Sequence, residues 1–219
     1  RSSVDGKSIC CGVRAMLANA SNSLEVAHVA SSQSLETVAV ELSNGKVAEL
    51  RPVVAADAPL FVDGLSRLSE SSRFARFGMG IDHLSAQELR YLTDVDQKRH
   101  VAFGALIEGD AAGVGRYVVL PNTECAEVAV TVIDKHQRQG LGRALFMALV
   151  AVARHDGLET FCFAVTPSNE AVKRILSSAA EANEASGLVE GNIQLSDFTQ
   201  GEYDDDVVAL VERHRAAKP

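Results

Sequence analysis

A strand-like run, a glycine-rich loop and a helix-like run follow one another from Cys125 onward, and this order constrains the fold more than any other feature of the chain. Residues 127–133 are apolar and mostly β-branched, with a single carboxylate, which is typical of a central strand covered on both faces. After residue 142 strong helix formers dominate, and apolar residues recur with the period of a helix. The pattern predicts a buried strand that leads through a glycine loop into a helix.

Glycines at the start of that helix predict a site for an anion. The first turn of a helix offers unpaired backbone N–H groups and the positive end of the helix dipole. Gly140 and Gly142 lack the Cβ atoms that would hold the oxygens of a phosphate away from those groups. Arg143 and Ala144 stand where a Walker loop has a lysine and a hydroxyl residue, so the sequence does not match a nucleoside triphosphate site. A dinucleotide-binding fold would place an acidic residue after the next strand, whereas Glu159 precedes it.

The loop resembles a motif that binds the pyrophosphate of acyl-CoA. Its sequence, Gln137-Arg138-Gln139-Gly140-Leu141-Gly142, matches the pattern Gln/Arg-x-x-Gly-x-Gly/Ala of the GNAT superfamily of N-acetyltransferases. Residues 49–176 resemble the catalytic domain of bacterial protein-lysine acetyltransferases that act on acyl-CoA synthetases. The other segments that carry this resemblance are Leu50-Arg51-Pro52 and residues 69–77, 92–100, 113–117 and 126–129. The resemblance implies the GNAT fold, an α/β (α+β) architecture in which helices flank a mixed, mostly antiparallel central sheet.

The rest of the chain is predicted from periodicity and turn signals. An Asn44-Gly45 pair between two strand-like runs predicts a hairpin in which both turn residues accept positive φ. We expect residues 1–46 to form an N-terminal extension whose hairpin strand packs on the main domain, residues 47–219 to form the acetyltransferase domain, and residues 69–80 to be a linker within it. Strands are predicted at 24–30, 36–42, 47–54, 100–107, 112–120, 159–165 and 188–195, and helices at 55–68, 85–92, 169–180 and 207–216.

Glu127 is the only carboxylate on the central strand and is the candidate general base. A lysine amine has a pKa near 10.4, so a base that removes its proton contributes about 10²–10⁴-fold at neutral pH. Strand alternation places residues 127, 129 and 131 on one face of the sheet, and burial there would raise the pKa of Glu127 toward a useful range. The resemblance implies the same role, because the family's proposed base stands in Ala-Glu-Val-Ala ten residues before the loop glutamine. The alternative is an ion pair between Glu127 and an arginine such as Arg116.

The resemblance also implies which residues contact acetyl-CoA. Backbone N–H groups at the end of the strand would polarise the thioester carbonyl, with Val132 as the expected donor. The N–H groups of the loop would hold the pyrophosphate, and the loop arginines would add positive charge. Asn169 would contact the pantetheine arm or cap the helix that it begins. The expected set is Val130, Thr131, Val132, Gln137, Arg138, Gln139, Gly140, Leu141, Gly142, Arg143 and Asn169.

One feature departs from the family pattern. Many acetyltransferases of this fold carry a tyrosine in the last core helix, where it protonates the coenzyme thiolate, but residues 170–182 contain no tyrosine. A thiol pKa near 8.5 makes the thiolate a tolerable leaving group. We therefore expect solvent to protonate it, with Ser177 or Ser178 as the alternative.

The amino-acid composition indicates which kinds of binding partner and which cellular compartment to expect. A formal net charge of −8 argues against nucleic acid and favours cationic substrates, although it also suits solubility. No apolar run approaches the roughly 18–20 residues that span a membrane. The four cysteines, at 10, 11, 125 and 162, lack the spacing of metal ligands, so we expect no metal and reduced thiols. These features predict a cytoplasmic protein.

Three functions remain open on the sequence alone. The first is acetylation of a protein lysine, such as one in an acyl-CoA synthetase, in a shallow acidic groove. The second is acetylation of a small amine or amino acid in a closed acceptor pocket, and the third is a non-catalytic acyl-CoA sensor. Arg73, Arg76, Asp82 and His83 either contact the acceptor or form a solvent-exposed rim. The acyl length and the choice between monomer and dimer stay open.

Overall fold

The structure is a computed structural model that describes residues 35–77, 81–121, 123, 125–166, 180–185 and 188–218. The strand predicted at 24–30 and the candidate cofactor residue Asn169 lie outside the described residues. So does the helix predicted at 169–180, except for Ala180, which begins a strand.

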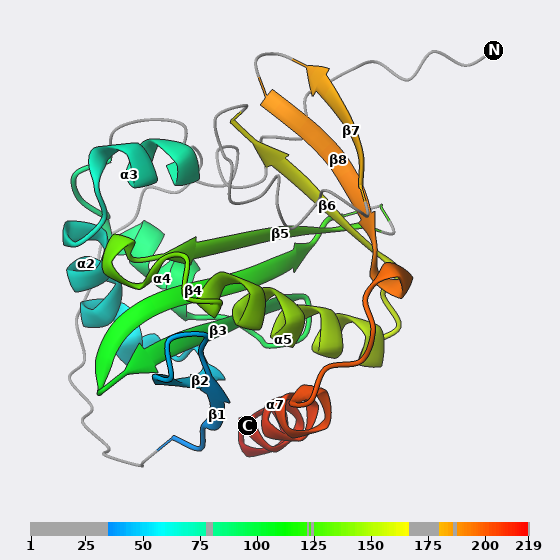
Figure 1. Cartoon of the computed structure of the whole chain (residues 1–219), viewed down its shortest axis with the longest axis horizontal. Coiled ribbons are helices and arrows are strands. Elements are labelled where there is room, and N and C mark those ends of the chain that lie inside the picture. The colour runs from blue at the N-terminus through cyan, green and yellow to red at the C-terminus, as the bar shows by residue number, and fades with distance from the viewer. Residues whose placement is uncertain are drawn as a thin grey trace.

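A mixed sheet of eight strands forms the centre of the fold, in the order β1-β2-β3-β4-β5-β6-β8-β7 (Figure 1). Neighbouring strands are antiparallel except β5 and β6, which are parallel. The predicted fold class, a mixed and mostly antiparallel sheet flanked by helices, is confirmed. The strands are β1 (Val38–Glu41), β2 (Val47–Pro52), β3 (His100–Ile107), β4 (Asp110–Val119), β5 (Cys125–Val132), β6 (Thr160–Val165), β7 (Ala180–Ala185) and β8 (Leu188–Gln194).

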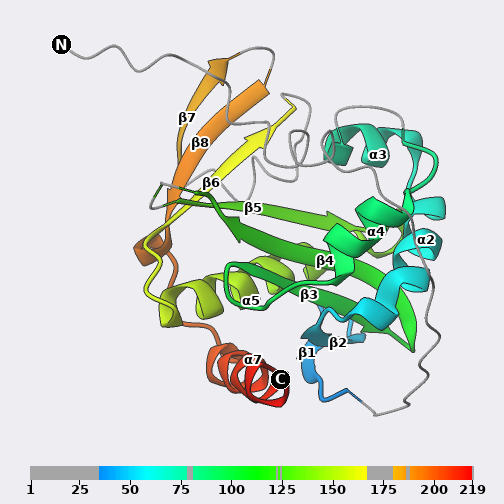
Figure 2. The same cartoon turned by 180° about the vertical axis from the view of Figure 1, so that it is seen from behind.

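Helices cover both faces of the sheet. On one face α5 (Leu141–His155) lies across β3, β4 and β5, with α7 (Asp204–Ala217) beside it, and these helices bury the main apolar core. On the other face lie the short η2 (Ala55–Asp57), α2 (Ala58–Ser66) and α4 (Ala86–Thr93), which Figure 2 shows in front of the sheet. Among the helices that the structure describes, none has the length and apolar character needed to cross a membrane.

The predicted linker at 69–80 is wrong, because Glu70–Phe77 forms helix α3. Its start is fixed by contacts distant in sequence. Asp134, in the short η3 (Asp134–His136), accepts hydrogen bonds from the Ser69 N–H at 2.9 Å and from the Ser69 hydroxyl at 2.7 Å. The Ser69 hydroxyl in turn accepts the N–H of Ser72 at 3.2 Å, as an N-cap residue does. Local propensity could not reveal a helix whose cap is held by a carboxylate 65 residues away.

The hairpin predicted around Asn44-Gly45 is present, but its turn differs from the prediction. Residues 42–46 connect β1 to β2, and the Leu42 N–H donates to the Lys46 carbonyl at 2.8 Å. Only Gly45 of the expected pair has positive φ, at 78°. Asn44 acts through its side chain instead, because its Oδ1 accepts the Lys46 N–H at 3.1 Å. A longer loop closed by an asparagine side chain thus replaces the tight turn.

Strand β5 is not covered on both faces as predicted. Of its eight residues only Ala126 is buried, and the others are half-exposed. The alternation of its side chains is as expected: Val128, Val130 and Val132 pack toward the α5 core, whereas Thr131 faces the side of α2.

Candidate active site

An opening between β5 and β6 is the feature around which the site is built. The two strands pair only where Cys125–Glu127 of β5 meets Thr160–Cys162 of β6. Beyond this point the two strands no longer pair with each other, and Figure 1 shows them diverging from their common start. Backbone groups in the second half of β5 are therefore not used by a neighbouring strand on that side.

The ladder between β4 and β5 decides which groups of β5 face the opening. Leu120 N–H donates to Cys125 at 3.1 Å, and Ile133 N–H donates to Ala112 at 2.9 Å, so odd-numbered residues of β5 pair with β4. Val130 and Val132 consequently direct their N–H and C=O groups toward β6, where the strands have separated. Of the three strand residues expected to contact acetyl-CoA, Thr131 is different, since its backbone belongs to the ladder.

The loop after β5 presents a series of N–H groups beside this opening. Arg138 has φ of 59° and Gly140 has φ of 90°, and Gly140 is the N-cap of α5. The first intrahelical bond runs from the Ala144 N–H to the Gly140 carbonyl at 3.0 Å, so the N–H groups of residues 141–143 have no intrahelical partner. Backbone segments in which the sign of φ alternates in this way form concave nests of N–H groups that bind anions.

Packing against neighbouring residues does not explain why residue 142 is a glycine, whereas a bound phosphate would. A Cβ at this position would lie 3.6 Å from Val132 Cγ2, an ordinary van der Waals contact. The fold therefore has room for alanine here, and the absence of a side chain keeps the first turn of α5 open on the side of β5. An anion would gain the space that the Cβ leaves free.

Replacing Gly142 with Asp should separate stability from coenzyme binding. A carboxylate in the first turn of a helix interacts favourably with the helix dipole, and glycine is unfavourable inside a helix, so the midpoint of thermal unfolding should stay unchanged or rise. Affinity for CoA, measured by calorimetric titration, should fall about tenfold or more, because the new carboxylate would repel the pyrophosphate. Gly142→Ala is the control and should bind CoA within a few-fold of wild type, because the family motif accepts alanine at this position. Unchanged affinity in Gly142→Asp would show that the pyrophosphate does not bind at this helix.

The side chains of the two loop glutamines hold the shape of the loop. Gln139 donates from Nε2 to the Lys135 carbonyl at 3.0 Å, and its Oε1 accepts Asn44 Nδ2 at 2.8 Å. Its carbonyl accepts the N–H of Ser43 at 3.1 Å, so the β1–β2 hairpin supports the loop. Gln137 donates to the Val132 carbonyl at 3.0 Å and to the Ser72 hydroxyl at 3.2 Å, which links the loop to α3. The contacts with Asn44 and Ser72 could not be predicted from the sequence, because they join segments 95 and 65 residues apart.

Glu127 lies at the base of the opening, opposite Cys162 in the last register pair of β5 and β6. Burial raises the pKa of its carboxyl group, and the positive charge of Arg76 on α3 partly opposes this rise. The alternative partner Arg116 is engaged elsewhere: it donates to His100 Nε2 at 3.1 Å and to the Leu92 carbonyl at 3.2 Å. Glu127 forms no ion pair with any residue in the described part of the chain.

A profile of the acetyltransferase (GNAT) family matches residues 67–177, about half of the chain. The chain belongs to this family. Members of the GNAT family use acetyl-CoA as the acyl donor, which is the ligand that the loop and the opening between β5 and β6 were expected to hold.

Three relatives illustrate the relationship. An acetyltransferase of Pseudomonas aeruginosa is 30% identical over 159 residues, which cover 71% of this chain and 83% of the relative. Acetyltransferase Pat of Mycolicibacterium smegmatis is 31% identical over 144 residues, 64% of this chain but only 42% of the relative. The crystal structure of the GNAT domain of S. lividans PAT has a TM-score of 0.67 and 28% identity, and the match covers 72% of this chain and 96% of that domain.

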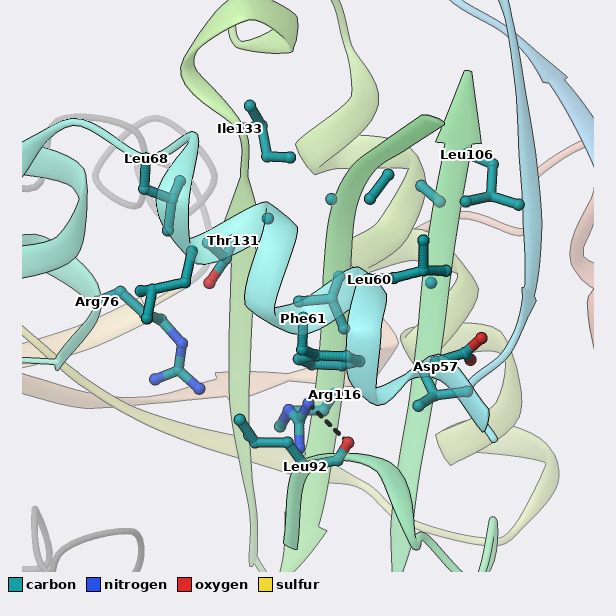
Figure 3. A pocket seen from close by; sticks show the side chains of 18 of the residues that line it. Asp57, Leu60, Phe61, Leu68, Arg76, Leu92, Leu106, Arg116, Thr131 and Ile133 are labelled. Carbon is teal, nitrogen blue, oxygen red and sulfur yellow. Dashed lines mark hydrogen bonds between the residues drawn. The ribbon is translucent and has the colours of Figure 1, made fainter. Parts of the chain in front are cut away.

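A cavity of about 100 Å³ lies between α2 and the sheet of this GNAT protein (Figure 3). Its lining is largely apolar, and Thr131 of β5 contributes to it. Arg76 and Arg116 line one end, as Figure 3 shows. The other lining residues include Leu60, Phe61, Leu65, Leu68, Leu84, Leu92 and Ile133.

The end of the cavity near Glu127 is cationic rather than acidic. Burial and the charge of Arg76 lower the pKa of Arg116 to about 9, so this guanidinium remains charged at neutral pH. Burial and Arg116 lower the pKa of His100 to about 4, so the imidazole is neutral there. Burial raises the pKa of Tyr91, whose ring lies 5.1 Å from that of His100. No sequence pattern associated Tyr91 or His100 with the site, and an acidic groove was predicted for a lysine acceptor.

Proposed function

We propose that the protein is an N-acetyltransferase that moves an acetyl group from acetyl-CoA to the side-chain amine of a protein lysine, with Glu127 as the general base. The observation that supports this most is the place of Glu127. It is the carboxylate of β5, its pKa is raised by burial, and it stands where β5 and β6 begin to separate. A base whose pKa is raised toward neutrality can both exist as a carboxylate and accept a proton from an amine.

The proposed roles of the other residues follow from the geometry. The N–H groups of the α5 first turn and of residues 138–140 would bind the pyrophosphate, and Arg138 and Arg143, both exposed, would add charge. The N–H groups of Val130 and Val132 would donate to the thioester oxygen and so increase the positive character of the carbonyl carbon.

The proton must travel between Glu127 and an amine held near those N–H groups. Val130 is three residues from Glu127, about 10 Å along a strand. A water molecule would therefore bridge the distance between the Glu127 carboxylate and the amine. As the amine nitrogen bonds to the acetyl carbon, Glu127 takes its proton and the carbon–sulfur bond breaks. Solvent then protonates the departing thiolate, since the coenzyme thiol has a pKa near 8.5.

Support for a protein lysine as the acceptor comes from the resemblance to bacterial protein-lysine acetyltransferases over residues 49–176. The cavity beside Thr131 favours a second candidate, acetylation of an amino acid. Its apolar lining and the guanidinium groups at one end match an acceptor that carries both an apolar part and a carboxylate.

A thiol-release assay tests the proposal. Acetyl-CoA would be supplied with an acyl-CoA synthetase, a lysine peptide, polyamines or free amino acids. We expect release with the protein or the peptide. Release with small amines alone would overturn the lysine assignment. Binding of acetyl-CoA without release to any acceptor would indicate a non-catalytic sensor.

A further inference from the structure

The guanidinium of Arg76 interacts electrostatically with Glu127 without forming an ion pair with it. It lies on α3 and lines the cavity below α2, and within the described part of the chain it forms no hydrogen bond or ion pair (Figure 3). Two nearby arginines differ from it: Arg73 pairs with Asp82 at 3.8 Å, and Arg51 pairs with Asp57 at 2.6 Å. Arg76 is half-buried, and its guanidinium carbon lies 5.4 Å from the centre of the Phe77 ring, a cation–π contact that uses none of its N–H donors. These donors can bind an anionic ligand.

The charges around Arg76 leave room for one more anion. Arg76 is close enough to Arg116 for its charge to lower the pKa of Arg116. His100 and Tyr91 are neutral at pH 7 and add no charge. Glu127 is the carboxylate that acts on Arg76. Among the described residues, two guanidinium groups against one carboxylate give the site a net positive charge, which favours an acceptor with a carboxylate near its amine over an acceptor that is cationic throughout.

Arg76 belongs to the acceptor half of the site. The donor carbonyl is expected at the N–H groups of Val130 and Val132. Arg76 instead interacts with Glu127, and Glu127 lies about 10 Å or more from those N–H groups along β5. The amine must lie between the carbonyl and the base. A group on the acceptor, next to that amine, is therefore within reach of Arg76.

We propose that Arg76 binds a carboxylate that the acceptor carries next to its reacting amine. This inference rests on the proposed acetyl transfer and refines its acceptor. A planar guanidinium binds a carboxylate through two parallel hydrogen bonds, which fixes orientation as well as charge. The carboxylate has two sources: the α-carboxylate of a free amino acid, or an aspartate or glutamate that flanks a lysine in a polypeptide.

The test compares matched acceptors with the wild type and the Arg76→Gln variant. One pair is a lysine peptide with a flanking aspartate and the same peptide with asparagine; the other is an amino acid and its amide. With wild-type protein, kcat/KM should be about 10- to 100-fold higher for the carboxylate member of at least one pair, the range of a charge-assisted hydrogen bond. Arg76→Gln should remove this preference, mainly through KM, and Arg76→Lys should restore part of it. The pair that responds identifies the source of the carboxylate.

Arg90→Gln is the control, because it removes the same charge from an exposed position on α4. It should leave both preferences unchanged, and thermal unfolding should show that all variants fold. Equal losses of kcat/KM for the charged and the neutral acceptors in Arg76→Gln would overturn the inference and would indicate that Arg76 acts on Glu127 rather than on the acceptor. Preferential use of succinyl-CoA that depends on Arg76 would also overturn it, by placing the carboxylate on the donor. Absence of transfer to any amine in the wild type would instead reject the proposed function itself.

Discussion

Replacing Glu127 with Gln is expected to lower kcat by about 10²–10⁴-fold while the affinity for acetyl-CoA stays within a few-fold of wild type. Glutamine has nearly the same shape but cannot accept the proton of the attacking amine. The affinity should persist because the groups expected to bind the pyrophosphate lie on a different segment, residues 138–143. Steady-state thiol release and calorimetric titration of CoA measure the two quantities.

The pH dependence of the wild type gives an independent measure of the same residue. Glu127 must be ionised to act as the base, so kcat/KM should rise with pH as the carboxyl group loses its proton. Burial raises the pKa of Glu127, so the midpoint of this acidic limb should lie above the usual value for glutamate, and the limb should be absent in Glu127→Gln. Glu49→Gln is a matched control, since Glu49 is an exposed glutamate on β2. Unchanged kcat in Glu127→Gln would contradict the assignment of the base.

Replacing Asp57 with Ala is expected to lower the free energy of unfolding by about 3–5 kcal/mol. Asp57 accepts two hydrogen bonds from Arg51, at 2.6 and 2.8 Å, and a third from the Val54 N–H at 2.9 Å. Both residues are buried, with exposed fractions of 8% for Arg51 and 6% for Asp57. The variant would leave a buried guanidinium without a counter-charge beside the start of α2. Urea denaturation followed by circular dichroism measures the loss.

A surface ion pair near the C-terminal end of α2 provides the comparison. Asp63 and Arg67 are joined at 2.7 Å but are more exposed, so Asp63→Ala should cost less than about 1 kcal/mol. The double variant Arg51→Met with Asp57→Leu should recover most of the loss, because it leaves no unpaired charge. Equal costs for Asp57→Ala and Asp63→Ala would show that the buried pair contributes no more than a surface pair.

The Leu50-Arg51-Pro52 segment illustrates how a recognisable motif can serve the fold instead of the reaction. It contributed to the family resemblance, and its arginine lines the same cavity as Arg76 and Arg116. In the structure Arg51 is neutralised by Asp57, whereas Arg76 is not. Sequence similarity alone does not distinguish these roles, because the difference depends on which carboxylate lies within reach.

The strand, loop and helix between Cys125 and His155 could be predicted from the sequence alone, because periodicity and glycine positions are local properties. The sequence also placed Glu127 and Thr131 on one face of β5, since alternation follows from strand geometry alone. The separation of β5 from β6 could not be predicted in this way. It depends on pairing between strands distant in the chain, and it leaves β5 half-exposed where a covered strand was expected.

The surroundings of these residues depend on contacts between distant segments and could not be predicted from the sequence. The supports of the loop, Asn44 and Ser72, come from segments 95 and 65 residues away from the glutamines that they bind, and the cap of α3 needs Asp134. Arg76 lies beside Glu127 because α3, for which the sequence predicted a linker, is helical and is tethered to η3. Charge and burial at a site are sums over nonlocal neighbours, so the sequence determined the chemistry of Glu127 and the fold determined its environment.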